Sequence, residues 1–534
     1  MTCSTLHALT FKAEETTIKW AGGFYTVQQQ TSFTTGSQTD TSVAPPIAYL
    51  NTTPGNHCGH QHKASIRYFH DNDWISLCLD CWRRQRSEGS PHVQWPSLTR
   101  FGLNSGTAFL ANALGLHANP RQHDAFRNNL YRRAVPTQRP HRIMLYSHDT
   151  YGLGHLRRNL AIARQLLAFP GRFEVLLITG SPMQDSWPLP SGLTVRALPP
   201  VIKLGDEHYG PRDHAKNFAL LKGHREALIL EAALSFRPDV LLVDHAPIGM
   251  GGELLPTLAL LQEEHPQTRL VLGMRDIIDA PHATKKVWQE QGIIDILDRV
   301  YDAILVYGRE DWFDVVATYD MPPTVADKVR YCGYVCNEYT EEFICRMLPE
   351  PPSGYPRILV TVGGGGDGSR IIEAYLTALR RLHGFGCQSL IVPGPLMDPA
   401  ERERLELTLD DMPTVHLIDG ATDMLPLMRQ CDLVISMAGY NTSAEILSLG
   451  CKAILVPRAY PRAEQRLRAE MLARFGLAEY VDPDGDLVEQ LARLVPLALS
   501  DQSCARSRIM LDGTARVAAE LNDLAARPEA ELTA

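Results

Sequence analysis

The chain has 534 residues, carries a formal net charge of −9, and is 44% hydrophobic. This length predicts two or three domains, and the apolar fraction is ample for their cores. The acidic balance gives no global reason to expect a nucleic-acid partner, although a local basic site for a negatively charged acceptor stays open.

Eleven cysteines are scattered along the chain, without a dense framework and without an N-terminal signal peptide before them. This usage predicts a reducing compartment. No apolar run approaches the roughly 18 to 20 residues that span a bilayer. We therefore expect a soluble cytoplasmic protein, for which peripheral association with the cytoplasmic membrane stays open.

Residues 1–139 form an N-terminal extension with little sustained periodicity. Within it, Cys78 and Cys81 have the Cys-x-x-Cys spacing of a structural zinc site, and Cys58 with His60 or His62 would complete four ligands. The alternative is a partly disordered or partner-binding segment with incidental cysteines.

From residue 140 onward, short apolar strands alternate with amphipathic helices, which predicts a parallel sheet covered on both faces. We assign a first domain to residues 140–340 and a second to residues 341–510, with a C-terminal helix and tail at 511–534. Strands are predicted at 142–147, 174–179, 239–244, 269–273 and 303–307, and again at 357–362, 389–394, 414–418, 432–436 and 453–457. The fold class is α/β, with two Rossmann-like doubly wound domains facing a cleft.

In each domain the first strand runs into a glycine-rich loop and then a helix, as in "SHDTYGLGHLRR" (147–158) and "GGGGDGSR" (363–370). Glycine lets the backbone approach a ligand, and the helix N-terminus presents free N–H groups to an anion. Tight packing alone is the competing explanation. Neither loop matches a dinucleotide fingerprint or a P-loop. The candidate glycines are Gly152, Gly154, Gly363, Gly364, Gly365 and Gly366.

A third loop follows the predicted strand at 432–436, where Ala438, Gly439, Asn441 and Thr442 open a helix that carries Glu445. One reading is simple N-capping by Asn441, Thr442 or Ser443, with Glu445 placed near the helix dipole. Downstream, Glu464 and Gln465 again follow a strand and begin a helix. Two neighbouring loops with carboxylate and amide groups make a candidate site for hydroxyl groups.

Residues 432–475 resemble the C-terminal half of family 28 glycosyltransferases, which include the lipid-linked N-acetylglucosaminyltransferase of peptidoglycan synthesis and plant monogalactosyldiacylglycerol synthases. The shared pattern is a strand, a Ser-x-Ala-Gly loop, a Thr-x-x-Glu helix start, a Val-Pro strand and a loop ending in Gln. The resemblance extends weakly over residues 141–525. It implies the GT-B fold, with a nucleotide sugar held mostly by the C-terminal domain.

The resemblance implies that Glu445 binds the ribose hydroxyls, and that Glu464 and Gln465 contact the sugar or the ribose. The glycines of 363–366 and the loop of 438–442 would hold the diphosphate by backbone N–H groups. Met437 stands where many family members carry arginine, so that a cationic contact is missing or comes from elsewhere, for example from Arg458.

"GLGH" (152–155) resembles the family's Gly-Gly-His loop beside the reaction centre, which makes His155 the candidate base. Asp149, Asp244 and His245 are rival bases or residues that orient the base. A packing or capping role for His155 is the alternative. Arg158, with its neighbour Arg157, either steers a diphosphate or lies on a solvated helix face.

The sequence thus predicts an inverting glycosyltransferase that moves a hexose or N-acetylhexosamine from a UDP-sugar to a polysaccharide, lipid-linked or small-molecule acceptor. No Asp-x-Asp stands where a metal-dependent transferase needs it, so we expect no catalytic metal and no cofactor beyond the nucleotide-sugar co-substrate. Two alternatives stay open. One is a UDP-sugar hydrolase whose His155 activates water, and the other is a non-catalytic sugar-nucleotide sensor.

Overall fold

The computed structural model describes two kinds of region. Before residue 139 it describes only the backbone of five strands, and after it residues 139–148, 154–181, 189–205, 208–211, 217–337, 350–364, 368–395, 397–418, 424–458, 460, 462–500 and 511–526. The chain divides into two compact units, residues 1–119 with 222–227, and residues 120–221 with 228–534. Within the described ranges, no helix is both long and apolar enough to cross a membrane.

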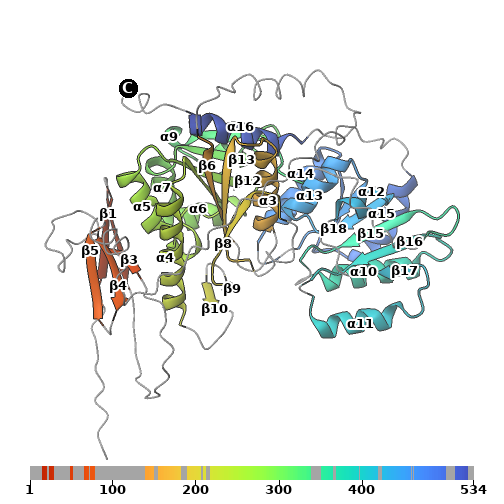
Figure 1. The fold of residues 1–534 in the computed structure, drawn as a ribbon. Coiled ribbons are helices and arrows are strands. Elements are labelled where there is room, and N and C mark those ends of the chain that lie inside the picture. The colour runs from red at the N-terminus through yellow and green to blue at the C-terminus, as the bar shows by residue number, and fades with distance from the viewer. Residues whose placement is uncertain are drawn as a thin grey trace, which may run out of the picture. The chain divides into compact units, whose positions relative to one another are not determined.

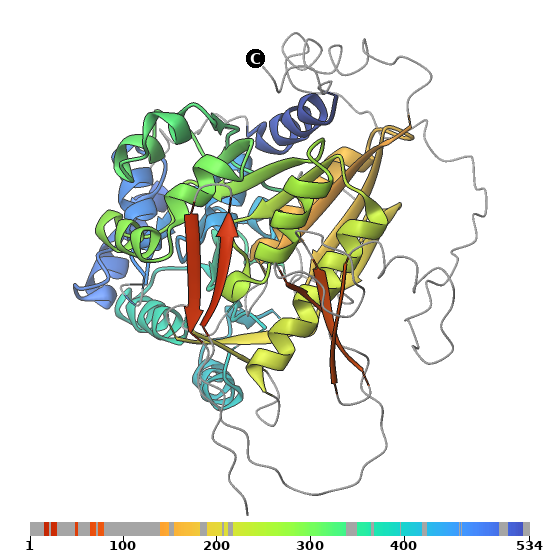
Figure 2. The ribbon, with the colours of Figure 1, turned by 90° about the vertical axis from the view of Figure 1, so that its left-hand side faces the viewer.

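The first unit contains antiparallel strands that the sequence pattern did not predict. They are β1 (Glu15–Trp20) with β2 (Gly23–Gln28), and β3 (Ala48–Asn51) with β4 (Ser65–His70) and β5 (Asp73–Cys78), drawn in red in Figure 2. The predicted zinc ligands Cys58, His60, His62 and Cys81 lie outside the described residues, as does the side chain of Cys78. The zinc site therefore stays a prediction.

The second unit begins with a seven-stranded sheet in which every neighbouring pair is parallel. Its order is β14-β13-β12-β11-β6-β7-β8. The strands are β6 (His141–Ser147), β7 (Phe173–Thr179), β8 (Leu193–Ala197), β11 (Val240–Asp244), β12 (Arg269–Arg275), β13 (Ala303–Tyr307) and β14 (Val329–Tyr331). Five of these were predicted, whereas the two edge strands β8 and β14 were missed because half-buried edges lack a continuous apolar run.

Helices connect these strands, and they are α3 (Gly154–Leu167), α4 (Phe218–Phe236), α5 (Leu255–Glu264), α6 (Pro281–Glu290), α7 (Ile293–Arg299), α8 (Val315–Thr318) and α9 (Pro323–Ala326). A hairpin of β9 (Val201–Gly205) and β10 (His208–Pro211) and a 3-10 turn, η2 (Met250–Gly252), complete this part.

The second sheet has six parallel strands in the order β17-β16-β15-β18-β19-β20. Its strands are β15 (Arg357–Thr361), β16 (Gln388–Val392), β17 (Val415–Leu417), β18 (Leu433–Ser436), β19 (Ala453–Leu455) and β20 (Glu479–Tyr480). Its helices are α10 (Ser369–Arg381), α11 (Pro399–Leu409), α12 (Leu425–Arg429), α13 (Tyr440–Leu449), α14 (Glu464–Arg474) and α15 (Leu487–Ser500).

Side chains of β15 alternate between two apolar cores, as expected for a sheet with helices on both faces. Ile358 and Val360 pack with α10 and α15, whereas Leu359 packs with α13 and α14. The predicted pair of doubly wound α/β layers is therefore confirmed. The predicted domain limits near residue 340 and 510 stay a prediction, although the two sheets do lie on either side of residue 341.

The last described helix, α16 (Gly513–Ala526), returns to the first sheet, as Figure 1 shows. Val517, Leu521 and Leu524 join the same apolar core as Ile143 and Leu145 of β6. Helix α16 therefore packs against the first sheet, although it follows the second sheet in the sequence.

Each sheet has one point where the strand order reverses. In the first sheet it lies between β6 and β11, and in the second between β15 and β18. Loops that leave the carboxyl ends of strands at such a point form the usual ligand crevice of doubly wound folds. All three loops singled out in the sequence follow β6, β15 or β18.

Candidate active site

His155 and Asp244 lie together at the reversal point of the first sheet. Asp244 ends β11, and His155 stands in the first turn of α3, so that His155 Nδ1 is 2.7 Å from Asp244 Oδ2. A carboxylate only accepts hydrogen bonds, so the imidazole donates from Nδ1 and keeps its lone pair on Nε2. Asp244 thus holds the ring of His155 through Nδ1, a geometry that suits the orienting role among those that the sequence left open, and the role itself stays a prediction. Asp149 and Gly152 lie outside the described residues.

Arg158 completes this cluster from the next turn of α3. Its Nη2 donates to Asp244 Oδ2 at 2.9 Å and also lies 2.9 Å from His155 Nδ1. Only 2% of the Arg158 side chain is exposed, so the solvated-face expectation was wrong for this residue. Arg157 is also largely covered and pairs with Glu445.

Burial and charge set the protonation states of the cluster. Burial would raise the pKa of Asp244, but the Arg158 guanidinium and His155 outweigh it and lower the pKa to about 2. Burial lowers the pKa of His155 below its ordinary value, although Asp244 opposes this shift. The pair is therefore a neutral imidazole on a carboxylate at neutral pH, as a general base requires.

His245 lies directly beyond Asp244 in an uncommon backbone conformation, with φ of 74°. Its amide donates to the carbonyl of Gly273 at 2.7 Å, which holds the strained turn. Its ring centroid is 5.4 Å from that of His155, and its Nε2 is 3.2 Å from Nη2 of Arg275, the last residue of β12. The carboxyl ends of β11 and β12 thus share one basic cluster.

At the second sheet, α13 starts after Gly439 without any side-chain cap. Capping by Asn441, Thr442 or Ser443 is therefore wrong as an account of this loop, and within the described ranges no side chain caps the first-turn N–H groups, which suits them to an anion. Asn441 instead donates from Nδ2 to the carbonyl of Gly154 at 3.1 Å. Asn441 thereby joins the starts of α3 and α13.

Glu445 lies in the second turn of α13, not in the first, so the dipole explanation for it was wrong. Its side chain is 2% exposed and makes an ion pair with Arg157 of α3. The residue that the resemblance assigns to ribose is thus held by a cation from the opposite sheet.

Gly363 and Gly364 follow β15, and Gly363 has a positive φ of 63°. Gly394, which follows β16 and was not singled out in the sequence, packs against them. A Cβ at Gly394 would lie 2.4 Å from the carbonyl oxygen of Gly363. Only glycine fits this contact, which keeps two neighbouring loops in register. Gly365 and Gly366 lie outside the described residues.

Glu464 and Gln465 begin α14, and both are buried. Arg458 Nη2 donates to Glu464 Oε1 at 2.5 Å, and the Arg458 amide donates to Gln465 Oε1 at 3.3 Å. The suggested phosphate contact, Arg458, is therefore already neutralised by a carboxylate. Met437 is buried in the apolar core of the second sheet.

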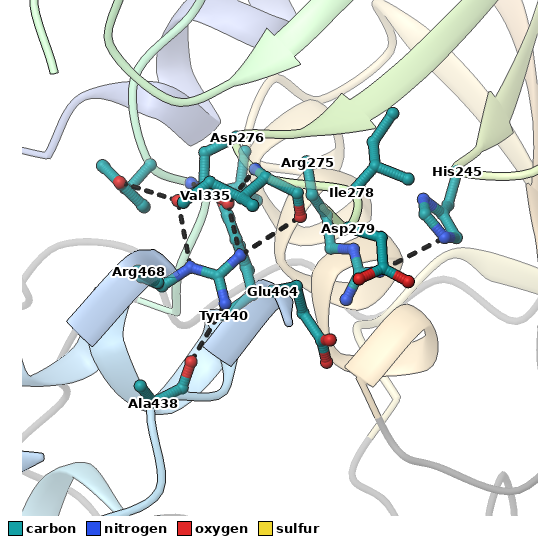
Figure 3. Close-up of polar contacts among 12 residues, drawn as sticks. His245, Arg275, Asp276, Ile278, Asp279, Val335, Ala438, Tyr440, Glu464 and Arg468 are labelled. Atoms are coloured by element: carbon teal, nitrogen blue, oxygen red, sulfur yellow. Dashed lines mark hydrogen bonds and ion pairs between the residues drawn. The ribbon is translucent and has the colours of Figure 1, made fainter. Parts of the chain in front are cut away.

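Arg468 of α14 is the centre of a buried polar network that sequence reasoning missed (Figure 3). It donates to Asp276 through Nε at 3.0 Å and Nη2 at 2.6 Å, and its Nη1 donates to the carbonyl of Ala438 at 2.9 Å. Tyr334 donates to Asp276 at 2.8 Å. Arg468 thus fixes the loop before α13 to the carboxyl end of β12. Arg468 lies one helical turn after Glu464 and Gln465, and this spacing was the sequence signal that could have marked it as a site residue.

Comparison with known proteins supports the resemblance read from residues 432–475. Residues 358–510 match the profile of the Glycosyltransferase family 28 C-terminal domain. A UDP-N-acetylglucosamine--N-acetylmuramyl-(pentapeptide) pyrophosphoryl-undecaprenol N-acetylglucosamine transferase of Paenarthrobacter aurescens (strain TC1) is 33% identical over 150 residues, 28% of this chain and 39% of the relative. The NDP-glycosyltransferase YjiC of Bacillus subtilis (strain 168) is 26% identical over 130 residues, 24% of this chain and 31% of the relative. The chain thus spans well under half the length of these curated relatives.

Solved structures share the fold over a longer stretch. The calicheamicin glycosyltransferase CalG4 and a UDP-glucosyltransferase from Polygonum tinctorium each superpose with a TM-score of 0.50 at 16% identity, covering 73% of this chain and 100% of theirs. The two parallel sheets of 7 and 6 strands therefore have the GT-B arrangement that the sequence predicted.

Proposed function

We propose that this chain, which carries a glycosyltransferase family 28 C-terminal domain, transfers a sugar from a nucleotide sugar to an acceptor hydroxyl with inversion. The observation that carries the proposal is the meeting of two helix starts. Asn441 of α13 donates to Gly154 at the start of α3, next to His155. The oriented base of the first sheet and the uncapped helix of the second therefore share one site.

In the proposed reaction, Nε2 of His155 takes the proton of the acceptor hydroxyl as its oxygen attacks the anomeric carbon. The new C–O bond forms on the face opposite the breaking bond to the diphosphate, so the configuration inverts. The nucleoside diphosphate leaves with its charge against the N-terminus of α13 and the glycine loop after β15. Asp244 stabilises the imidazolium that forms.

The donor is a UDP-sugar in this proposal, because several relatives, such as the one of Paenarthrobacter aurescens, carry UDP-N-acetylglucosamine in their names. Glu445 would accept hydrogen bonds from the ribose hydroxyls, and Glu464 and Gln465 would contact the sugar. Arg157 must then leave Glu445, and its guanidinium becomes available to the diphosphate. The acceptor is a polysaccharide, a lipid-linked glycan or a small molecule, and a lipid-linked acceptor would place the protein at the cytoplasmic membrane.

A thermal-shift panel tests the donor site. UDP, GDP, dTDP, UDP-N-acetylglucosamine, UDP-glucose and UDP-galactose are compared on the wild type, on Glu445→Gln and on the control Glu373→Gln, an exposed acid of α10. We expect a concentration-dependent rise in melting temperature with one nucleotide, kept in Glu373→Gln and lost in Glu445→Gln. The absence of any shift at millimolar ligand would remove the transferase proposal.

Hydrolysis is the second candidate, because the His155–Asp244 pair can activate water as well as an acceptor hydroxyl. Product analysis with and without acceptors separates the two. Free sugar that is released at an unchanged rate in the presence of every acceptor would favour the hydrolase. Nucleotide binding without any turnover would favour the sensor.

A further inference from the structure

Four arginines around the site each have a carboxylate partner. The ion pairs are Arg157–Glu445, Arg158–Asp244, Arg458–Glu464 and Arg468–Asp276. Arg275 differs from them. Among the residues that the structure describes, no carboxylate makes an ion pair with Arg275, and its hydrogen bond goes to the neutral ring of His245. Within the described part of the chain, Arg275 is thus a cation without a carboxylate partner beside four matched pairs.

The surroundings of Arg275 disfavour its charge. Burial and the neighbouring Arg158 guanidinium lower the pKa of Arg275 to about 10, although Glu464 opposes the shift. Burying a cation without a counter-ion costs free energy that a bound anion recovers. A bound anion would therefore supply the counter-charge for Arg275.

Hydrogen-bond donors also lack acceptors here. Arginine cannot accept a hydrogen bond, so Arg275 Nη2 donates to His245 Nε2, and the proton of the neutral His245 ring is on Nδ1. His245 Nδ1 and Arg275 Nε are both buried donors for which the described residues offer no acceptor. Two unmatched N–H groups beside an unmatched positive charge suit a ligand with several acceptor oxygens, such as a phosphoryl group.

The position of the pair ties it to the reaction. The ring of His245 is 5.4 Å from that of His155, the proposed base, and Figure 3 shows the contact of His245 with Arg275. At the edge of the second sheet, Met437 is apolar and Arg458 is already paired. The second sheet thus offers no unpaired cation at these two positions, whereas Arg275 of the first sheet can contact a phosphoryl group.

We propose that Arg275 and His245 form an anion subsite that binds a phosphoryl group of a substrate beside His155. The phosphoryl group belongs either to the donor diphosphate or to a phosphorylated acceptor. This assignment to a substrate rests on the proposed sugar transfer, whereas the anion subsite itself does not.

Calorimetric titration with inorganic pyrophosphate and with UDP tests the subsite. The proteins are the wild type, Arg275→Gln, Arg275→Lys and the control Arg299→Gln, an exposed arginine of α7. We expect pyrophosphate to bind the wild type and Arg299→Gln equally, to bind Arg275→Gln at least tenfold more weakly, and to bind Arg275→Lys with intermediate affinity. Equal affinity of pyrophosphate for the wild type and Arg275→Gln overturns the proposal. So does a lack of binding to the wild type at about 10 mM pyrophosphate.

Competition identifies the source of the phosphoryl group. If saturating UDP blocks pyrophosphate, the subsite serves the donor. If pyrophosphate still binds in the presence of UDP and Arg275→Gln removes this binding, the subsite serves the acceptor. If UDP does not bind while Arg275→Gln still abolishes pyrophosphate binding, the transferase proposal fails and the subsite stands.

Folding of the variant provides a separate check. Because no described carboxylate makes an ion pair with Arg275, Arg275→Gln should melt at or above the temperature of the wild type. If it does not yield folded protein, His245→Ala decides the matter. We expect His245→Ala to weaken pyrophosphate at least threefold, and an unchanged affinity would contradict the subsite.

Discussion

The two sheets reverse their strand order in the same way, yet they equip the reversal point differently. After β6 and β11 the first sheet carries ionisable side chains, His155, Arg158 and Asp244. After β15 and β18 the second sheet carries glycine loops and an uncapped helix start at Gly439. In the proposed function, topology sets where the ligand lies, and the residues at the strand ends give one edge the proton transfer and the other the anion binding.

The comparison also shows how the two edges depend on each other. Arg157 of the first sheet holds Glu445 of the second, and Asp276 of the first holds Arg468 of the second. Each edge therefore depends on the other for ion-pair partners of its charged side chains. Variants that affect one edge alone can therefore test whether the division into chemistry and binding is real.

Replacing the base should have the largest effect. His155→Ala removes the proton acceptor, and we expect nucleotide release from the best-binding UDP-sugar to slow about a thousandfold, a barrier increase of about 4 kcal/mol. His282→Ala, at an exposed position of α6, is the control and should keep the wild-type rate. Equal rates for His155→Ala and the control would contradict the assignment of the base.

Breaking the buried link between the edges should come next. Arg468→Leu leaves Asp276 buried and uncompensated, which should lower the free energy of unfolding by about 3 kcal/mol or more. Arg466→Leu on the same helix removes surface pairs with Glu470, Asp482 and Asp484, and should cost about 1 kcal/mol or less. Urea unfolding measures both, and similar losses would show that the buried network is not the link.

Acidification should destabilise the first edge selectively. Burial lowers the pKa of His155, and burial with the Arg275 charge lowers the pKa of His245 well below its ordinary value. A histidine with a lowered pKa stays neutral in the folded protein, whereas in the unfolded chain it takes up a proton near pH 6.5. The folded state therefore has its full stability above about pH 6.5 and loses stability as the pH falls below that value. The unfolding free energy should decline between about pH 6.5 and 5, and His245→Ala should flatten this decline. An unchanged slope would contradict the buried, neutral state of His245.

The smallest effect is expected at the contact between the two helix starts. Asn441→Ala removes one neutral hydrogen bond to Gly154, which should cost about 1 kcal/mol or less in unfolding free energy. Ser448→Ala, which removes a hydrogen bond to the Glu445 carbonyl within the same helix, is a matched control. A loss of several kcal/mol in Asn441→Ala alone would show that this contact does more than the account assigns to it.

The sequence predicted the sheets well because their signal is local. The apolar runs of β6, β11, β15 and β18 are continuous, and each coincides with a predicted strand. The half-buried edge strand β8 has no such run and was missed. A continuous apolar run indicates a strand buried on both faces, so this signal is missing from a half-buried edge strand.

Pairing among charged residues was beyond the sequence, because it depends on which strands become neighbours. His155 and Asp244 were both candidates, but their contact crosses 89 positions of the chain, and the Arg468–Asp276 contact crosses 192. Arg158 was judged by the usual exposure of helix arginines, and the proximity of β11 to α3 reversed that judgement. Only the sheet order brings such partners together.

The most direct test of the account measures binding and turnover on the same two variants. UDP affinity and nucleotide release from the best-binding UDP-sugar are compared for the wild type, Glu445→Gln and His155→Ala. We predict that Glu445→Gln weakens UDP at least tenfold, whereas His155→Ala binds UDP within about twofold of the wild type and loses turnover. Loss of UDP binding in His155→Ala, or unchanged binding in Glu445→Gln, would contradict the division of binding and chemistry between the two sheets.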